Sequence, residues 1–193
     1  MAKSKDNVVM QGASGRIGKN LVFRQRGDET IIARRPRQKA GKQYTSDQKM
    51  VMNNFTRAAL YAKATIDDPQ LKEAYQAKTN NNQTAYNMAF RDYLVKPEVA
   101  LLDDISYGGN VGDMLTLLVK DVLKVKAITI EILDQDDNLI ESGQAQPVDS
   151  RNTQWKYTAT EDNPDYLTSK YRISMLDTPN KRTVVLKEYG GDG

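Results

Sequence analysis

Cysteine and histidine are both absent from the 193 residues of this chain. Without cysteine the protein forms no disulfide, has no thiolate nucleophile and offers no zinc–thiolate site. Without histidine it lacks the commonest general base, the usual partner of a nucleophilic serine and the commonest transition-metal ligand. We therefore predict a protein that is not an enzyme and that binds no cofactor and no metal ion.

Long apolar runs are absent as well, and hydrophobic residues make up only 39% of the chain. No run is long enough to cross a bilayer, so we expect no membrane insertion. The polar N-terminus, Met1–Asp6, is not followed by the apolar run of a signal peptide. We therefore expect synthesis in the cytoplasm without a Sec signal, and a final location in the cytoplasm or in an assembled particle.

Positive charge is concentrated near the N-terminus. Residues 1–44 hold eleven of the 28 Lys and Arg residues but three of the 25 Asp and Glu residues, a net charge of +8. Since the whole chain carries +3, the remainder carries −5. A basic segment joined to an acidic remainder indicates binding to nucleic acid, binding to the acidic part of another copy, or a solvated tail. No aromatic ladder or base-reading motif favours nucleic acid.

The glycine cluster Gly12-x-x-Gly15-x-x-Gly18 follows the apolar run Val8–Met10. In one interpretation the run is a strand and the glycines open a helix whose N-terminus holds a pyrophosphate. The segment resembles the opening of extended short-chain dehydrogenases and nucleotide-sugar epimerases, and Tyr166-x-x-x-Lys170 has the catalytic spacing of that family. The resemblance implies an NAD(P)-binding, reductase-like protein. However, the helix would have only about two turns, and no alternating strand–helix pattern follows it.

A β-hairpin accounts for the same stretch better. Leu21–Arg26 and Thr30–Arg35 are β-prone runs, and the intervening Gly27-Asp28-Glu29 suits a hairpin loop. Pro36 ends the second run because proline cannot donate to a ladder. Alternation assigns Val22, Arg24 and Arg26 to one face of the first strand and Leu21, Phe23 and Gln25 to the other.

We call residues 1–44 the arm. Because an isolated two-stranded hairpin is marginally stable in water, we expect the arm to bind a partner surface, most simply that of another copy of the chain. The residues that we expect to make these contacts are Arg16, Lys19, Phe23, Arg24, Arg26, Arg34, Arg35 and Arg37.

The motifs of this region resemble those of a family of uncharacterised proteins from Bacteroidota. They are the segment Gly15–Gly27, the segment Thr30–Pro36, and Thr45-x-x-Gln48 at the start of a helix that contains Phe55. Members of that family carry a Gly-Lys-x-Gly-x-x-Val-x-(basic) hairpin, a proline, a helix start with glutamine and a C-terminal β domain. The specific part of the resemblance covers roughly the first 60 residues. It implies a hairpin arm and a β domain, and it implies no activity, because the family has none assigned.

Three helices are predicted after the arm. Thr45 and Gln48 form a capping box, and the apolar face of this first helix is expected to hold Val51, Phe55, Ala58, Ala59, Ala62 and Ile66. Asp68 and Pro69 restart the chain as N-cap and first helical residue. The third helix, Gln83–Val95, carries an aromatic stripe that we assign to the core rather than to base stacking.

From Glu98 onward the chain consists of short β-prone runs separated by turns. Seven such runs in about 90 residues are typical of an immunoglobulin-like sandwich, with Trp155 expected in its core. The triplet Asp134-x-Asp136-x-Asn138 begins like a calcium loop but lacks the required glycine and the twelfth-position glutamate, so we predict a hairpin turn. The predicted strands are Val99–Ile105, Met114–Val119, Val125–Leu133, Leu139–Ala145, Gln154–Thr160, Lys170–Leu176 and Thr183–Tyr189.

The sequence therefore predicts an α+β protein with a β-hairpin arm and linker (1–44), a three-helix segment (45–97) and an immunoglobulin-like β-sandwich (98–193). The expected function is that of a structural protein that self-associates through its basic arm in a virion, a filament or another repeating assembly. The first alternative is a nucleic-acid-associated protein that uses the same arm. The second is the NAD(P)-binding protein described above.

Overall fold

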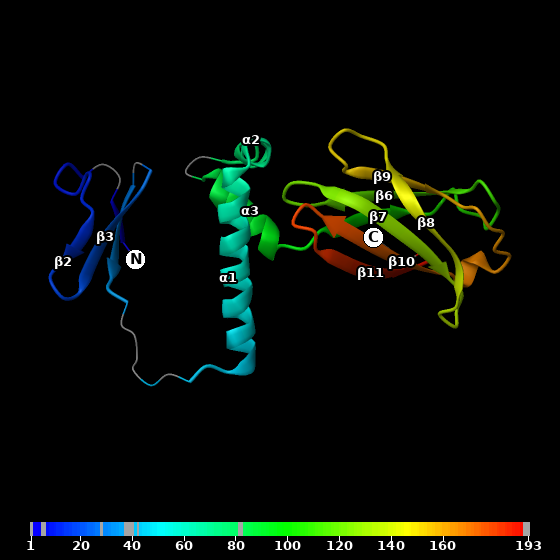
Figure 1. Cartoon of the computed structure of the whole chain (residues 1–193), viewed down its shortest axis with the longest axis horizontal. Helices are drawn as coiled ribbons and strands as arrows, with labels where there is room; N and C mark the ends of the chain where they lie inside the picture. Colours follow the sequence, from blue (N-terminus) through cyan, green and yellow to red (C-terminus); the bar gives the residue numbers. More distant parts are fainter. Residues whose placement is uncertain are drawn as a thin grey trace. The chain divides into compact units, whose positions relative to one another are not determined.

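The computed structural model describes residues 2–4, 7–27, 29–36, 41, 43–80 and 83–190. These residues form two compact units (Figure 1). The first comprises the described residues within Met1–Met52 and Asn80–Gln83, and the second those within Asn53–Thr79 and Thr84–Gly193. The described part of the chain is mixed α and β, with three helices and two antiparallel sheets. None of its helices combines the length and the apolar character that a membrane span needs.

The arm contains a four-stranded antiparallel sheet with the order β1-β4-β3-β2. The predicted hairpin is present, but its second strand begins and ends one residue earlier than predicted: β3 (Leu21–Arg26) pairs with β4 (Glu29–Arg34), Arg26 lies opposite Glu29, and Gly27 follows β3 with a φ of 58°. Two strands of three residues each, β1 (Ala2–Ser4) and β2 (Gly15–Ile17), flank the hairpin and were not predicted.

The predicted alternation of the hairpin is confirmed by its register. Phe23 lies opposite Ile32 and is 5% exposed, while the neighbouring Val22 lies opposite Ala33 on the other face. Two polar side chains tie the turn-rich segment before β2 to the sheet. Thr30 donates from its hydroxyl to the Met10 carbonyl at 2.9 Å, and the Gln25 amide donates to the Ala13 carbonyl at 3.0 Å. The arm therefore has a small core of its own around Phe23.

The dinucleotide interpretation is wrong in its structural premise. Val8–Met10 forms a turn rather than a strand, and the residues after Gly18 form a turn and then β3 rather than a helix. No helix N-terminus is thus available at these glycines to hold a pyrophosphate. Tyr166 belongs to a short 3₁₀ helix (Tyr166–Thr168) and Lys170 begins β10, so the pair does not share a helix either.

The predicted starts of the first two helices are confirmed by their capping bonds, whereas the third helix begins at Ala85 rather than at the predicted Gln83. Helix α1 (Ser46–Asp67) is preceded by Thr45 and opens with a capping box, in which Gln48 N donates to Thr45 Oγ1 and Thr45 N donates to Gln48 Oε1, both at 3.3 Å. Helix α2 (Pro69–Gln76) is capped by Asp68, whose carboxylate accepts from two backbone amides. Helix α3 (Ala85–Leu94) is capped by Thr84.

The core between the three helices covers a shorter part of α1 than the predicted apolar face of this helix. Ala58 and Ala62 are fully buried, but Val51 and Phe55 are 55% and 51% exposed. The reason is length, because α2 and α3, with 8 and 10 residues, are much shorter than α1 with 22. The core formed by the three helices consists of Ala62, Tyr75, Ala85, Met88 and Ala89.

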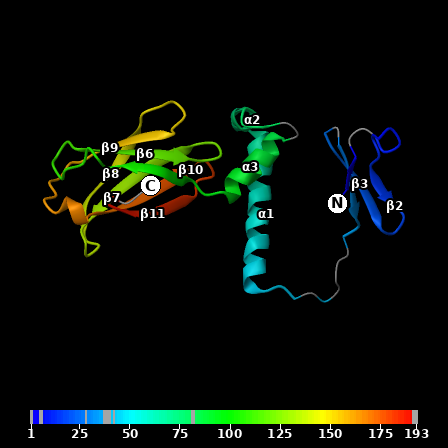
Figure 2. The same ribbon diagram turned by 180° about the vertical axis from the view of Figure 1, so that it is seen from behind.

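Seven strands form the second sheet, with the order β11-β10-β7-β8-β9-β6-β5. Strand β8 pairs with β7 up to Ala145 and with β9 through Gln146 and Pro147, so the sheet folds over on itself into a sandwich-like body (Figures 1 and 2). The strands are β5 (Glu98–Asp103), β6 (Met114–Lys120), β7 (Val125–Leu133), β8 (Leu139–Pro147), β9 (Gln154–Thr158), β10 (Lys170–Asp177) and β11 (Arg182–Glu188).

One apolar core lies between the two parts of this sheet. Alternate residues of β7, such as Ile128 and Ile130, are fully buried together with Leu115 and Leu117 of β6. The prediction for Trp155 is confirmed, because it is 2% exposed within this core. Its indole N–H donates to the Asn152 carbonyl at 2.9 Å, which satisfies the one polar group that burial would otherwise leave unpaired.

Candidate functional site

Four of the predicted arm residues lie on one face of the arm sheet. Arg16 lies opposite Val22, which places it on the same face as Arg24 and Arg26, and Arg35 continues this face beyond β4. A hollow of about 560 Å³ lies on this face and is lined by Arg16, Arg24 and Arg35 together with Gly15, Val22 and Pro36. None of these arginines forms an ion pair with another described residue, whereas Lys3 pairs with Glu29 at 3.0 Å. We call this surface the arginine face.

The remaining predicted arm residues lie elsewhere. Lys19 lies in the turn between β2 and β3, and Arg34 lies on the opposite face of the sheet, across from Leu21. Phe23 is buried in the core of the arm and is therefore not available as a surface contact. Arg37 falls outside the described residues.

The acidic charge of the second unit is concentrated in three segments at one end of the sandwich. The segments 103–113, 134–138 and 159–169 contain nine Asp or Glu residues and no Lys or Arg. Hydrogen bonds join the first segment to the third, because Gly112 N donates to the Ala159 carbonyl and Val111 N donates to Asp162 Oδ1. We call these three segments the acidic loops.

Local geometry fixes the acidic loops in place. Gly109 has a φ of +83°, and a Cβ at this position would lie 2.1 Å from the Asn163 carbonyl oxygen, so only glycine fits. The predicted hairpin turn at 134–138 is present, and Asp134 accepts from the backbone amides of Asp136 and Asn138. The hydrogen bonds from Asn138 hold the pKa of Asp134 below its usual range. Asp134 is thus held in a defined position within the acidic loops.

A buried polar network joins the helices to the opposite end of the sandwich. Tyr61 and Tyr75 share a hydrogen bond of 2.9 Å, and the Tyr75 hydroxyl donates to Asp92 Oδ2 at 2.5 Å. Asp92 is fully buried, and its second oxygen, Oδ1, has no partner among the described residues. Burial raises the pKa of Asp92 to about 7, and the nearby charges of Asp121 and Asp177 act in the same direction.

Asp121, in the turn between β6 and β7, faces Asp92 from the sandwich side. Burial raises its pKa, and the charge of Asp177 adds to this effect, while the hydrogen bond from Val122 N and the charge of Lys181 oppose it. Lys181 supplies the positive charge of the network. Its ammonium donates to the carbonyls of Tyr93 and Val95 at the end of α3 and lies 3.4 Å from Asp177 Oδ2.

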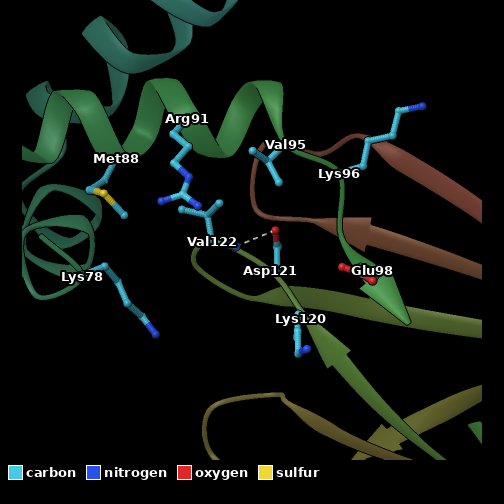
Figure 3. Close-up of a pocket in the computed structure, with 9 residues that line it drawn as sticks. All are labelled: Lys78, Met88, Arg91, Val95, Lys96, Glu98, Lys120, Asp121 and Val122. Atoms are coloured by element: carbon cyan, nitrogen blue, oxygen red, sulfur yellow. Dashed lines mark hydrogen bonds between the residues drawn. The ribbon is translucent and has the colours of Figure 1, made fainter. Parts of the chain in front are cut away.

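Two hollows flank the end of α3. The first, of about 300 Å³, has four cationic residues and two carboxylates in its lining (Figure 3). Arg91 points from α3 toward Val122, and Asp121 accepts a hydrogen bond from Val122 N at 2.8 Å (Figure 3). The full lining is Lys78, Met88, Arg91, Val95, Lys96, Glu98, Lys120, Asp121 and Val122.

The second hollow, of about 360 Å³, has four cationic residues and no carboxylate in its lining. Its lining residues are Asn54, Arg57, Tyr93, Leu94, Lys96, Lys181, Arg182 and Thr183. Neither hollow is predicted by the sequence, because the cationic residues that line them come from segments up to 125 positions apart and form no local pattern. The only local signal is the pair Lys181-Arg182 in a predicted turn region.

Comparisons with known proteins give no family for this chain. No family model matches it, and no curated protein is similar enough in sequence to match it. Among solved structures, it is similar to the catalytic module of the multi-modular glycogen-degrading pneumococcal virulence factor SpuA in complex with an inhibitor, with 15% identity over 49% of this chain and a TM-score of 0.33. A second structure of the catalytic module of SpuA is similar to this chain with 15% identity over 42% of this chain and a TM-score of 0.29. The chain covers only 13% and 12% of those two chains.

Proposed function

We propose that this chain is a non-enzymatic structural subunit that self-associates, with the arginine face of one copy bound to the acidic loops of the next. The observation that carries the proposal is the separation of charge. The arm is part of a compact unit of its own and presents arginines without a described acidic partner, while the acidic loops gather nine Asp and Glu residues at one end of the sandwich, of which Asp137 is paired with Lys170 at 2.7 Å. Oppositely charged surfaces of this kind steer association and select the partner.

The two surfaces differ from each other, so the contact is heterologous. A heterologous contact repeats from copy to copy and yields a closed ring or an open filament, depending on the rotation between neighbours. A virion component, a filament subunit or another repeating assembly all use such contacts. The final location of the chain would then be in the assembled particle.

The sandwich is proposed to be immunoglobulin-like. Its order places β5, β6, β9 and β8 side by side, and β7, β10 and β11 side by side. This arrangement supports the assignment, because immunoglobulin constant-type domains place strands A, B, E and D in one sheet and C, F and G in the other. In the proposed assembly this domain carries the acceptor surface at the end that holds the acidic loops.

Deletion of the arm tests the proposal. We expect a chain that begins at Thr45 to remain folded in the sandwich and to lose the association of the full-length chain, as measured by light scattering on a sizing column. Near-ultraviolet circular dichroism of the buried Trp155 reports whether the sandwich is intact. An unchanged association state in a folded, arm-deleted chain would contradict the proposal.

Nucleic acid is the second candidate partner of the arginine face. The hollow that Arg16, Arg24 and Arg35 line favours this candidate, because guanidinium groups pair with phosphate in a bidentate manner. Binding of this kind weakens steeply as salt is raised, since phosphate contacts release counterions. A titration with single-stranded and duplex oligonucleotides at two salt concentrations decides it: absent or salt-insensitive binding removes this candidate.

A further inference from the structure

The second hollow beside α3 brings together cations from three separate parts of the second unit. Arg57 comes from α1, Lys96 from the segment that follows α3, and Lys181 and Arg182 from the turn and strand start between β10 and β11. We call this the anion hollow. It takes no part in the proposed self-association.

The charge of Lys181 is already neutralised within the protein. Its ammonium binds the carbonyls of Tyr93 and Val95 and lies 3.4 Å from the carboxylate of Asp177. By holding these carbonyls, Lys181 also offsets the negative end of the α3 dipole, which would otherwise repel an anion. Lys181 therefore adds little net charge to the anion hollow.

The other three cations have no such partner. Neither Arg57, Lys96 nor Arg182 forms an ion pair with a described residue, and no Asp or Glu lines the hollow. This is unexpected in a part of the chain where acids outnumber bases by five, residues 45–193. In the first hollow, by contrast, the carboxylates of Glu98 and Asp121 line the hollow together with its cations. Three like charges around an unneutralised hollow repel one another, and an anion would relieve that repulsion.

The polar groups of the lining suit a phosphate group. Two guanidinium groups offer forked pairs of N–H donors, the Lys96 ammonium offers a point charge, and the Asn54 amide and Thr183 hydroxyl can also donate. A carboxylate has one charge and two oxygens and would leave much of this set unpaired, whereas a phosphate has up to two charges and three or more oxygens. We infer that the anion hollow binds the phosphate group of a small phosphorylated ligand. Its volume lies at the lower end of the range of small-molecule sites, which favours a ligand of about one or two phosphate groups.

Pyrophosphate is the probe that tests this inference on the full-length chain. We expect pyrophosphate to raise the midpoint of thermal unfolding above that in sodium chloride of equal ionic strength, because a ligand that binds only the folded state stabilises it. In the double variant Arg57→Gln, Arg182→Gln we expect the dissociation constant for pyrophosphate, measured by calorimetry, to rise about tenfold or more. The double variant should also unfold at a higher temperature than the wild type when no multivalent anion is present, because a charge repulsion has been removed.

Two controls make the result specific. Arg91→Gln removes one positive charge from the neighbouring hollow and should keep the wild-type affinity for pyrophosphate. The arm variant Arg16→Gln, Arg24→Gln should also keep the wild-type affinity for pyrophosphate. The binding of pyrophosphate can therefore fail while self-association holds, and self-association can fail while the binding of pyrophosphate holds. No gain over sodium chloride in the wild type, or equal loss of affinity in the Arg91 control, would overturn the inference. An oligonucleotide that binds the hollow far more tightly than pyrophosphate would overturn its assignment to a small ligand.

Discussion

The buried side chains of Tyr75 and Asp92 are joined by a hydrogen bond of 2.5 Å that links α2 to α3 beside the sandwich. The groups that face Asp92 come from every neighbouring element: Tyr75 from α2, Asp121 from the turn after β6, Asp177 from β10 and Lys181 from the turn after β10. Three carboxyl groups and one ammonium thus share a largely dry site. The network links the helices to the sandwich through Lys181, which binds the carbonyls of Tyr93 and Val95 at the end of α3.

This network predicts that stability depends on pH. Burial raises the pKa of Asp92 to about 7, above the value of about 3.9 in an unfolded chain. Between these two values the folded chain binds a proton that the unfolded chain has released. The stabilisation is therefore complete below about pH 4 and is lost as pH rises through 7. Asp121, whose pKa is raised as well, acts in the same direction.

The variant Asp92→Asn tests this prediction. An amide can accept from Tyr75 and donate toward Asp121 but cannot ionise, so the decrease in the unfolding midpoint between pH 5 and 8 should become smaller. Above pH 7 we expect the variant to unfold several degrees higher than the wild type, since about 1 kcal/mol corresponds to about 2–4 °C in a chain of this size. The exposed Asp136→Asn serves as control and should keep the wild-type pH profile. An unchanged profile in Asp92→Asn would contradict the account.

Neutralisation of the arginine face should weaken self-association without unfolding the protein. In the triple variant Arg16→Gln, Arg24→Gln, Arg35→Gln all three changes are at surface positions around the arm hollow, so the Phe23 core is retained. We expect the midpoint concentration of assembly to rise about tenfold or more, with a smaller dependence on salt. The matched change Lys63→Gln, Lys72→Gln, Lys78→Gln on the helices and the turn after α2 removes the same charge and should have little effect.

The acidic loops make the complementary prediction. Three acids of the loops enter the loops' hydrogen bonds through backbone atoms and not through their carboxylates: Asp136, Glu161 and Asp165. The triple variant Asp136→Asn, Glu161→Gln, Asp165→Asn therefore removes charge and leaves these hydrogen bonds in place. We expect this variant to lose self-association as the arm variant does. Asp47→Asn, Asp67→Asn, Glu73→Gln on the helices is the control with the same change in net charge.

Mixing the two variants gives a sharper result than either alone. The loop variant retains a working arm and the arm variant retains working loops, so one productive contact forms between them. A one-to-one mixture should yield a complex of about twice the mass of one chain and nothing larger. Full assembly in the mixture, or no complex at all, would show that the arm and the loops are not partners.

Glycine at position 109 should be essential for the loop end of the sandwich. Alanine there would bring its Cβ to 2.1 Å from the Asn163 carbonyl oxygen at a φ of +83°, so we expect a loss of about 2 kcal/mol or more. Gly112→Ala is the matched control. It shares a positive φ of +94° but meets no atom within 4 Å, so it should lose only the smaller backbone strain of about 1 kcal/mol. Denaturant unfolding measures both values.

Local patterns in the sequence predicted much of the fold. The alternation around Phe23, the capping box of Thr45 and Gln48, and the N-cap Asp68 are all short-range signals, and the structure confirms each of them. Strands β1 and β2 were missed because three residues of mixed polarity carry no alternation, and only pairing with β4 and β3 defines them. Val51 and Phe55 continued a helical apolar stripe, but the sequence does not say that α2 and α3 end too soon to cover them.

The charged surfaces show the same limit. The excess of arginine in the arm is visible in the sequence, whereas the anion hollow depends on Arg57 and Arg182 meeting through the tertiary fold. The acidic loops also look like three ordinary turns until the strand order places them at one end. The burial of Asp92 has no signal in the sequence, because a single acid in an amphipathic helix is ordinarily a surface residue.

The solution mass of the full-length chain tests the central claim most directly. Light scattering on a sizing column at low salt, with absorbance recorded at 260 and 280 nm, should give a defined assembly of many times 21.7 kDa that is free of nucleic acid. The assembly should dissociate as salt is raised, because its contacts are charged. A single chain of 21.7 kDa at low salt and high protein concentration would contradict the account.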